Sequence, residues 1–479
     1  MSIPMCRMAV RPISSLAACL FFLTFSAAAA ESPDMTLALP RFEPCQQQTR
    51  PMLPAKWRGV FLMAPFTPTQ LVISEIVYDE ALAAMQVRLF GVRSGAANVL
   101  VLGDKLFSLS ERGADTQCEE LDGGEWSPLP RDLVAAGARC VGSSPIAETP
   151  VEWWKTPSQP APLADWVWFK SSDRSPFRLL FQKPGDHLSV LSSFAVSYQV
   201  SFEPLTQSNL AALASACAQG AGRRQHRGVH DALRTMESTP SRADAEIKRL
   251  FPQLQWRCGS SRPHWPQALG MTMFLTPLDI GTDPVPAEVL YNWQLRSQRT
   301  RIFWGANSPT LDEDALMLAQ HGYSVSRQRS GEVRCIPALP GTPRPNWLAE
   351  APCTCEGLIG AGSPLTPYGA AEILHCSATP PRLFWTWHTL AGRPMMFMVT
   401  PSRGDEPTAL ITLADYYAWV PGYPSDEGLF ARPAQCPDLS ARAKLDRAIG
   451  GSLSVSSGRS LGRLAEPCGS CHLTPEKPR

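Results

Sequence analysis

The residues best suited to chemistry lie near the C-terminal end of the sequence, in the run Cys468-Gly469-Ser470-Cys471-His472. Two thiols at this spacing can each form a thioether to a vinyl group of haem, and the histidine that follows then lies under the iron as its proximal ligand. We therefore predict that Cys468 and Cys471 attach a covalent haem c and that His472 binds its iron. The attachment takes place outside the cytoplasm, so this prediction requires an exported chain.

The other axial position of such an iron is not supplied by the motif. Only seven residues follow His472, and none of them is Met or His. A sixth ligand must therefore come from earlier in the chain or from a partner, or be absent. The first candidates are the imidazole of His388 and a methionine sulfur, with His375 and His264 behind them. Each of these side chains could equally be a structural residue, and the methionines a part of the core: Met395, Met396 and Met398.

Residues 1–30 have the pattern of a secretory signal. Arg7 and Arg11 precede the mainly apolar stretch Ile13–Phe25, and small residues for cleavage stand at Ala27–Ala30. We therefore expect a periplasmic or secreted protein. Cys19 lies inside the apolar stretch rather than after it, so a lipoprotein anchor is not expected. No later stretch approaches the roughly 18 apolar residues of a membrane span, so no transmembrane segment is expected in the mature chain.

Composition narrows the class of protein. The 44 basic residues balance 43 acidic ones, which argues against a nucleic-acid binder. The 46 prolines favour many short strands over long helices.

The cysteines predict a disulfide framework. Of 14 cysteines, two lie in the signal and two in the C-terminal motif, which leaves ten to pair in an oxidising compartment. We predict Cys45–Cys217, Cys118–Cys140 and Cys258–Cys436, with Cys335 joined to Cys353 or Cys355 and the remaining one joined to Cys376.

Internal similarity indicates a tandem duplication. Tyr78–Gly91 resembles Tyr291–Gly305, and Trp166-Val167-Trp168 matches Trp385-Thr386-Trp387. Four cysteines recur in the same order, 213 to 219 positions apart. We therefore predict a first β-rich repeat at residues 31–217 and a helical linker at 218–257. A second β-rich repeat at 258–436 and a tail with the C-x-x-C-H motif at 437–479 follow.

Each repeat has a β pattern. Strand-length apolar or alternating runs stand at Gln70–Tyr78, Ala84–Gly91, Asn98–Leu102 and Lys105–Ser110. A helix is predicted for Ser208–Gln219, because Leu210, Leu213 and Cys217 share one helical face. The predicted fold class is mainly β: two antiparallel curved sheets of the half-barrel kind, tied by disulfides and each closed by a helix.

Two resemblances add to this interpretation. The run Ser457–Leu464 before the C-x-x-C-H motif resembles the first helix of small c-type cytochromes, which implies the attachment and ligand roles given above for Cys468, Cys471 and His472. The order of cysteine, strand meander, cysteine, aromatic strands and terminal helix resembles LolA/LppX or ependymin-type half-barrels. That likeness implies an exported curved sheet that holds a lipid or other apolar ligand, and it assigns no functional residue.

Three functions remain open from the sequence. The first is a periplasmic c-haem protein for electron transfer, which would dock a partner redox protein. The second is a binding protein for an apolar, lipid-like ligand. The third is a non-catalytic structural or assembly protein of the envelope. No catalytic triad, P-loop or paired-carboxylate motif stands out, so the sequence gives no positive evidence for an enzyme.

Overall fold

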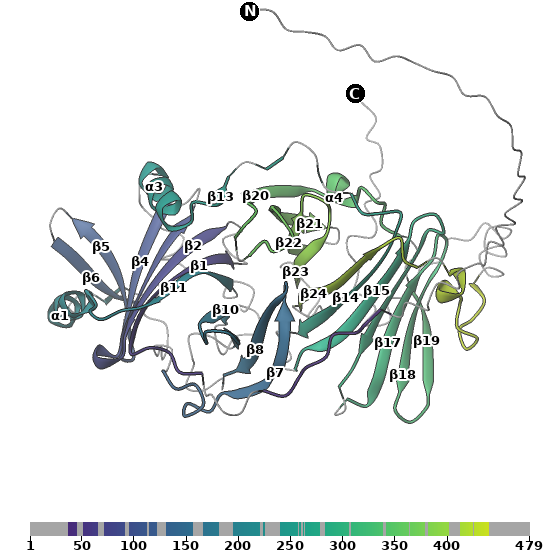
Figure 1. Ribbon diagram of the computed structural model, residues 1–479, viewed down its shortest axis with the longest axis horizontal. Helices are drawn as coiled ribbons and strands as arrows, with labels where there is room; N and C mark the ends of the chain where they lie inside the picture. Colours follow the sequence, from purple (N-terminus) through teal and green to yellow (C-terminus); the bar gives the residue numbers. More distant parts are fainter. Residues whose placement is uncertain are drawn as a thin grey trace, which may run out of the picture. The chain divides into compact units, whose positions relative to one another are not determined.

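Two large antiparallel sheets make up the computed structural model (Figure 1), each built mainly from one of the two sequence repeats, with one two-residue strand added from the stretch between them. The structure describes residues 37–45, 51–65, 71–91, 95–112, 115–121, 131–156, 166–181, 195–220, 224–225, 240–256, 258–259, 262, 264–277, 283–305, 308–338, 342–363, 365–378, 382–401, 412–424 and 426–439. These described residues belong to one compact unit.

Sheet 1 contains twelve strands in the order β12-β6-β5-β4-β3-β2-β1-β11-β10-β9-β8-β7. Their bounds are β1 (Lys56–Pro65), β2 (Val72–Asp79), β3 (Ala84–Gly91), β4 (Gly95–Leu102), β5 (Lys105–Arg112), β6 (Asp115–Leu121), β7 (Arg139–Ile146), β8 (Thr149–Lys155), β9 (Trp166–Lys170), β10 (Pro176–Phe181), β11 (Ala195–Pro204) and β12 (Arg224–Gln225).

Sheet 2 contains twelve strands in the order β13-β20-β21-β22-β23-β24-β14-β15-β16-β17-β18-β19. Their bounds are β13 (Leu254–Gln255), β14 (Ala268–Pro277), β15 (Val285–Asn292), β16 (Ser297–Phe303), β17 (Thr310–Met317), β18 (Gly322–Gln328), β19 (Val333–Ala338), β20 (Cys353–Ile359), β21 (Ala371–Ala378), β22 (Arg382–Thr389), β23 (Pro394–Pro401) and β24 (Thr412–Pro421).

The duplication predicted from the sequence is present strand for strand. Counting from β1 in sheet 1 and from β14 in sheet 2, eleven strands follow the same order, with the first and eleventh paired at the centre. Irregularities in pairing recur at equivalent places, at Val60/Phe61 and Thr272/Met273 on the first strand. Even an ion pair is repeated, since Arg88 binds Glu75 as Arg301 binds Glu288. The two sheets therefore descend from one ancestral unit.

The helices are few and short. The described ones are η1 (Glu80–Leu82), α1 (Leu210–Gly220), α3 (Pro240–Leu250), α4 (Trp347–Glu350) and η3 (Glu427–Phe430). The helix predicted at the end of the first repeat is confirmed as α1, with Leu210 and Cys217 fully buried. In the second repeat the described residues before Cys436 contain only the single turn η3, and Leu439, at the end of the described chain, is helical.

The ten cysteines form five disulfides, but most of the predicted partners were wrong. The observed pairs are Cys45–Cys140, Cys118–Cys217, Cys258–Cys355, Cys335–Cys436 and Cys353–Cys376. The predicted pairs Cys45–Cys217, Cys118–Cys140 and Cys258–Cys436, and the link from Cys335 to Cys353 or Cys355, do not form.

Strand order explains the difference. The first and eleventh strands meet at the centre, so the sixth and seventh lie toward opposite ends of the sheet, and the cysteines they carry cannot meet. Cys118 on β6 instead bonds to α1, and Cys140 on β7 to the N-terminal segment. The first four pairs are equivalent between the repeats, with sequence separations of 95 and 97 for one pair of bridges and 99 and 101 for the other. Such bridges are consistent with folding outside the reducing cytosol.

Candidate functional site

The haem motif lies outside the described residues, so its predicted role is not tested by the structure. Residues 1–30, with the predicted signal, lie outside them too. The ten cysteines between the predicted signal and the motif pair among themselves, so neither sheet has an unpaired cysteine for Cys468 or Cys471.

The residues proposed as a sixth iron ligand are core residues in this fold. His388 on β22 is 1% exposed, and Met398 on β23 is fully buried. Met395 and Met396, at 6% and 2%, are nearly as enclosed. None of these four side chains is accessible to a haem iron while the core stays closed. His264 is exposed, so His264, a partner ligand or an open iron are the forms of the haem hypothesis that remain.

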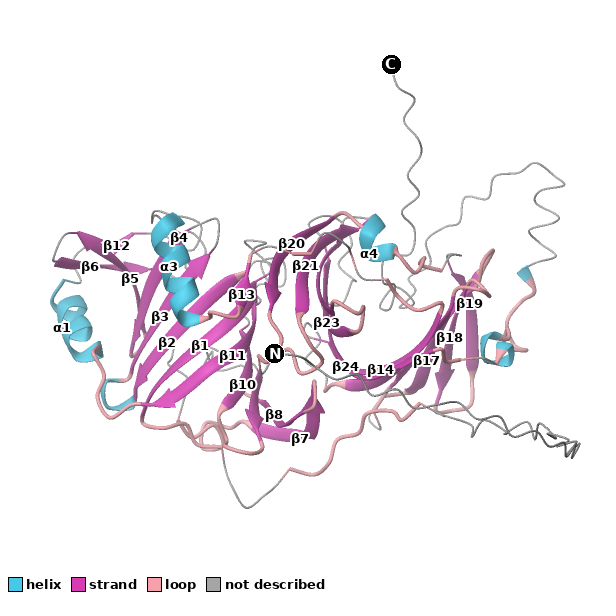
Figure 2. Ribbon diagram, turned by 45° about the horizontal axis from the view of Figure 1, so that its top comes forward, coloured by secondary structure: helices cyan, strands magenta, loops and turns pink. Residues whose placement is uncertain are grey.

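One face of each sheet is closed by the connection between its sixth and seventh strands, and we call these the plugged faces. In sheet 1 the connection contributes Leu133 and Ala138, and in sheet 2 it contributes α4, which lies next to β20 and β21 (Figures 1 and 2). Leu133 and Leu348 stand the same distance before Cys140 and Cys355, and both are 1% exposed or less.

Alternate residues of each strand point to the same side of a sheet, and on the plugged faces these residues are mainly apolar. In sheet 1 the wall is built from Trp57, Phe61, Ile76, Tyr78, Met85, Val99, Val101, Leu106, Trp154, Val167, Phe169 and Leu179. In sheet 2 it is built from Trp265, Leu269, Met271, Met273, Leu275, Val285, Ala287, Val289, Tyr291, Ile302, Leu374, Cys376 and Ala414.

A tryptophan packs on the repeat-equivalent tyrosine in both plugged faces. The rings of Trp57 and Tyr78 are stacked with centroids 5.8 Å apart, and those of Trp265 and Tyr291 meet edge-on at 5.3 Å. Trp265 also meets Trp347 of α4 at 5.3 Å. The Tyr291 ring is fully buried, and burial raises the pKa of its hydroxyl well above the usual range.

Several polar atoms on these walls have no hydrogen-bond partner in the described part of the chain. They are the indole N–H of Trp57 in sheet 1, and the indole N–H of Trp265 and the hydroxyl of Tyr291 in sheet 2. Buried indole and phenol groups normally find partners, because leaving one unpaired costs about 1–3 kcal/mol. Both plugged faces therefore have hydrogen-bond donors that the described residues do not pair.

Sheet 2 adds a histidine to its plugged face. The Thr386 hydroxyl lies 2.9 Å from Nδ1 of His388, and the His388 ring meets Trp347 of α4 edge-on at 6.1 Å. Glu372 lies opposite His388 on the neighbouring strand and is fully buried. Burial lowers the pKa of His388 to about 3, so the imidazole is neutral in the folded protein at neutral pH.

We predict that this histidine makes the protein sensitive to acid. Its folded pKa lies below the value of about 6.5 for an unfolded chain, so the unfolded state binds more protons between about pH 3 and 6.5. The contribution of His388 to the free energy of unfolding is fully present above that window. It falls by up to about 1.4 kcal/mol for each pH unit as the pH is lowered through the window. Urea titrations across this range should show the loss. His388→Asn should reduce it, leaving the part owed to His375, whose pKa burial lowers to about 4, and the same change at exposed His264 should have no effect.

The opposite faces of the two sheets share one hydrophobic core. It joins Trp153, Trp168 and Tyr198 of sheet 1 to Phe274 and Trp387 of sheet 2, and the rings of Tyr198 and Trp387 lie 4.6 Å apart. The repeats are thus packed on each other through these faces.

A buried ion pair crosses that core. Arg178 on β10 is fully buried and donates two hydrogen bonds to the carboxylate of Asp415 on β24, from Nη1 to Oδ1 and from Nη2 to Oδ2. The Nη2–Oδ2 distance is 2.8 Å. The guanidinium also donates to the Tyr198 hydroxyl at 3.1 Å and lies over the Trp168 ring, 3.9 Å from its centroid. Burial alone would lower the pKa of Arg178, but the charge of Asp415 outweighs it and raises the pKa.

The segment at residues 37–45 also links the repeats. The Thr272 hydroxyl donates to the Ala38 carbonyl, and the Phe42 ring stacks on Phe274 of sheet 2 at 4.4 Å. Phe42 meets Trp153 of sheet 1 edge-on, and Cys45 is bonded to Cys140 on β7. This segment therefore runs from one sheet to the other.

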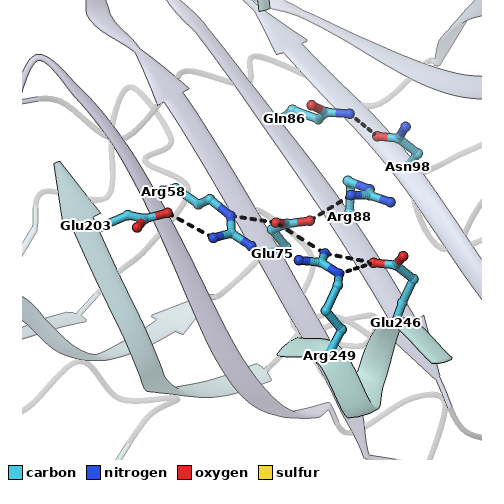
Figure 3. A network of polar contacts seen from close by, with 8 residues as sticks. All are labelled: Arg58, Glu75, Gln86, Arg88, Asn98, Glu203, Glu246 and Arg249. Carbon is cyan, nitrogen blue, oxygen red and sulfur yellow. Dashed lines mark hydrogen bonds and ion pairs between the residues drawn. The ribbon is translucent and has the colours of Figure 1, made fainter. Parts of the chain in front are cut away.

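Helix α3 is fixed on sheet 1 by both apolar and charged contacts (Figures 2 and 3). Ile247, Leu250 and the following Phe251 enter the shared core. Nearby, buried Glu75 accepts hydrogen bonds from Arg58 at 2.6 Å and Arg88 at 2.8 Å, and Arg249 of α3 approaches it to 4.0 Å. The helix thus acts as a fixed part of the core.

No group of three or more His, Cys, Asp or Glu in the described part of the chain could hold a metal ion. None of the helices described is long and apolar enough to cross a membrane.

Comparison with known proteins gives no family assignment. No protein-family model matches the chain, and no curated protein matches it. Among solved structures, a LolA superfamily protein from Nitrosomonas europaea is 10% identical and covers 35% of this chain and 92% of its own, with a TM-score of 0.20. An uncharacterized conserved protein from Thermus thermophilus is 12% identical over 36% of this chain and 88% of its own, with a TM-score of 0.25.

The MucA/MucB complex of Pseudomonas aeruginosa is 12% identical, covers 59% of this chain and 86% of the matched chain, and has a TM-score of 0.19. Scores this low do not establish a common fold, so the function has to be inferred from the site itself.

Proposed function

We propose that this chain is an exported binding protein whose plugged faces hold an apolar, lipid-like ligand with a hydrogen-bond acceptor near one end. The observation that carries the proposal is a set of buried donors with no partner among the described residues: Trp57 in one repeat, and Trp265 with Tyr291 in the other. Aliphatic and aromatic walls suit an acyl chain or similar body, and the donors suit a carbonyl, ester or amide oxygen.

In sheet 2 the side chains of Trp347 and Leu348 pack against the apolar wall, in the place that the ligand would take. Trp347 and Leu348 belong to a helix of four residues with no side-chain N-cap hydrogen bond, so little local structure is lost when it moves. A ligand that enters would displace Trp347 and Leu348 and make apolar contacts with the same wall. It would also accept hydrogen bonds from Trp265 and Tyr291. Export is supported by the signal-like residues 1–30 and the five disulfides, and the periplasm fits both.

The substitution Tyr291→Phe should separate ligand binding from stability. It removes the unpaired hydroxyl and keeps the ring, so the ligand-free protein should become more stable, by about 1 kcal/mol. Affinity for a fluorescent fatty-acid probe should fall by about tenfold, because a hydrogen bond made only with the ligand is lost.

The matched control is Tyr323→Phe, because the Tyr323 hydroxyl donates to the Pro437 carbonyl in a separate cluster. This change should lower stability and leave probe affinity unaltered. Failure of the wild-type protein to bind the probe at all would refute the ligand site and leave a c-haem protein or a structural protein of the envelope.

A covalent haem c on the tail is a second proposal, favoured by one specific observation. The other ten mature cysteines are satisfied in five disulfides, which leaves Cys468 and Cys471 for thioether bonds and His472 for the iron. When bound, the haem would supply one-electron chemistry, and a partner redox protein would be its counterpart.

Haem staining of denatured protein tests this second proposal directly. Protein produced with a haem-attachment system should keep a Soret band after denaturation and acid–acetone extraction, and the double change Cys468→Ala/Cys471→Ala should abolish it. Wild-type protein that never acquires covalent haem would refute the proposal without affecting the ligand site.

A further inference from the structure

The outer edge of sheet 2 is unpaired in the described structure. β19 is the last strand of that sheet and pairs only with β18. It also carries Ile336, which is 45% exposed and so is among the most exposed large apolar side chains described. Free strand edges next to exposed apolar residues are sites where a further strand can add.

The ladder between β18 and β19 shows which groups face outward. The Gln328 N–H donates to the Glu332 carbonyl at 2.8 Å, and in an antiparallel pair such bonded positions recur at every second residue. Arg334 and Ile336 are therefore bonded to β18, whereas the N–H groups of Val333 and Cys335 point away from the sheet. Pro337 has no N–H, so the usable edge is the stretch Val333–Ile336.

The equivalent edge in the first repeat is covered by the chain that follows its terminal helix. There β12 pairs with β6, Arg224 lying opposite Glu120 and Gln225 opposite Leu121. The Cys118–Cys217 bridge ties α1 to β6 and so brings this segment to the edge.

The second repeat has the same tether. Cys436, just after η3, is bonded to Cys335 on β19 itself. The Tyr323 hydroxyl donates to the Pro437 carbonyl at 3.1 Å, and Leu439 packs in the cluster that contains Val333 and Cys335. The described chain thus leaves the fold beside the open edge, and forty residues of sequence follow Leu439.

We propose that the segment Ser452–Ser457 of the same chain adds to β19 as a further strand. Leu453 and Val455 alternate with serines, and glycines flank the run at Gly450, Gly451 and Gly458, which is the pattern of a half-buried strand between turns. Twelve residues lie between Leu439 and Ser452, and the thirteen Cα–Cα steps that join these two residues can span up to about 45 Å. One apolar side chain of the segment would cover Ile336.

Hydrogen exchange in the full-length protein tests this pairing. The amides of Val333 and Cys335 should be protected in the wild type. In Val455→Pro they should exchange at least tenfold faster, because proline removes an N–H from the added strand. The matched control, Ser460→Pro, introduces the same residue outside the segment and should leave their exchange unchanged. Circular dichroism should show both sheets intact in both variants.

Unchanged protection of Val333 and Cys335 in Val455→Pro would overturn the proposal. If that protection also varies with protein concentration and light scattering shows a dimer, a second copy of the chain covers the edge instead. Rapid exchange of both amides in the wild type would mean that nothing covers the edge, and would equally overturn it.

Discussion

Asp415→Ala should destabilise the protein by about 3–5 kcal/mol, the cost of leaving one partner of a buried ion pair uncompensated. Arg178 is fully buried, and its other contacts are the Tyr198 hydroxyl and aromatic rings, none of which carries a compensating charge. Urea titration followed by tryptophan fluorescence would report the loss, because Trp168 lies against the guanidinium.

The matched control is Asp283→Ala, which removes another ion pair between the repeats. Its partner Arg139 is 54% exposed, so the expected loss is at most about 1 kcal/mol. The double change Arg178→Met/Asp415→Leu should recover most of the stability, because an apolar pair needs no charge compensation. Equal losses from Asp415→Ala and Asp283→Ala would show that the buried pair does not hold the repeats together.

Removal of one long-range disulfide should have an effect of similar size. Cys118→Ala/Cys217→Ala opens a bridge with a sequence separation of 99, worth about 4.7 kcal/mol in the chain-entropy model. The equivalent Cys335→Ala/Cys436→Ala, with a separation of 101, should cost the same. Urea titration under non-reducing conditions measures both.

The short bridge Cys353–Cys376 provides the comparison. Its separation is 23 and its cysteines lie opposite each other on β20 and β21, so its removal should cost less, about 3.4 kcal/mol. Peptide mapping without reduction should recover the five observed pairs. A peptide linking Cys118 to Cys140 would contradict the strand order, because those residues lie toward opposite ends of sheet 1.

Local features of the fold could be predicted from the sequence, whereas long-range pairing could not. The turn at Gly103 and the strands around it follow from alternation and turn residues, and β3 has the predicted bounds Ala84–Gly91. The pairing of β1 with β11 joins residues far apart in sequence, and no local pattern specifies it. The wrong disulfide partners follow from that one missing contact.

The candidate site was visible only in part. Tyr78 and Tyr291 begin the stretch in which the two repeats are most similar. Their tryptophan neighbours are not at equivalent positions, because Trp57 lies within the first strand of its sheet whereas Trp265 lies before it. Asp415 lies next to Ala414 and Tyr416 in a matched strand, but its partner Arg178 belongs to the other repeat. Alignment of the two repeats shows which residues they share, but it does not predict which residues of one repeat contact the other.

The plugged faces are expected to hold an apolar ligand, and mass spectrometry of the purified native protein tests this claim most directly. Protein isolated from an exporting host without detergent should carry a non-covalent apolar molecule with a carbonyl, ester or amide group. Organic solvent should extract that molecule, and Tyr291→Phe should retain less of it than Tyr323→Phe does. Protein that emerges free of any such molecule, and that fails to take one up from a mixed lipid extract, would contradict the claim.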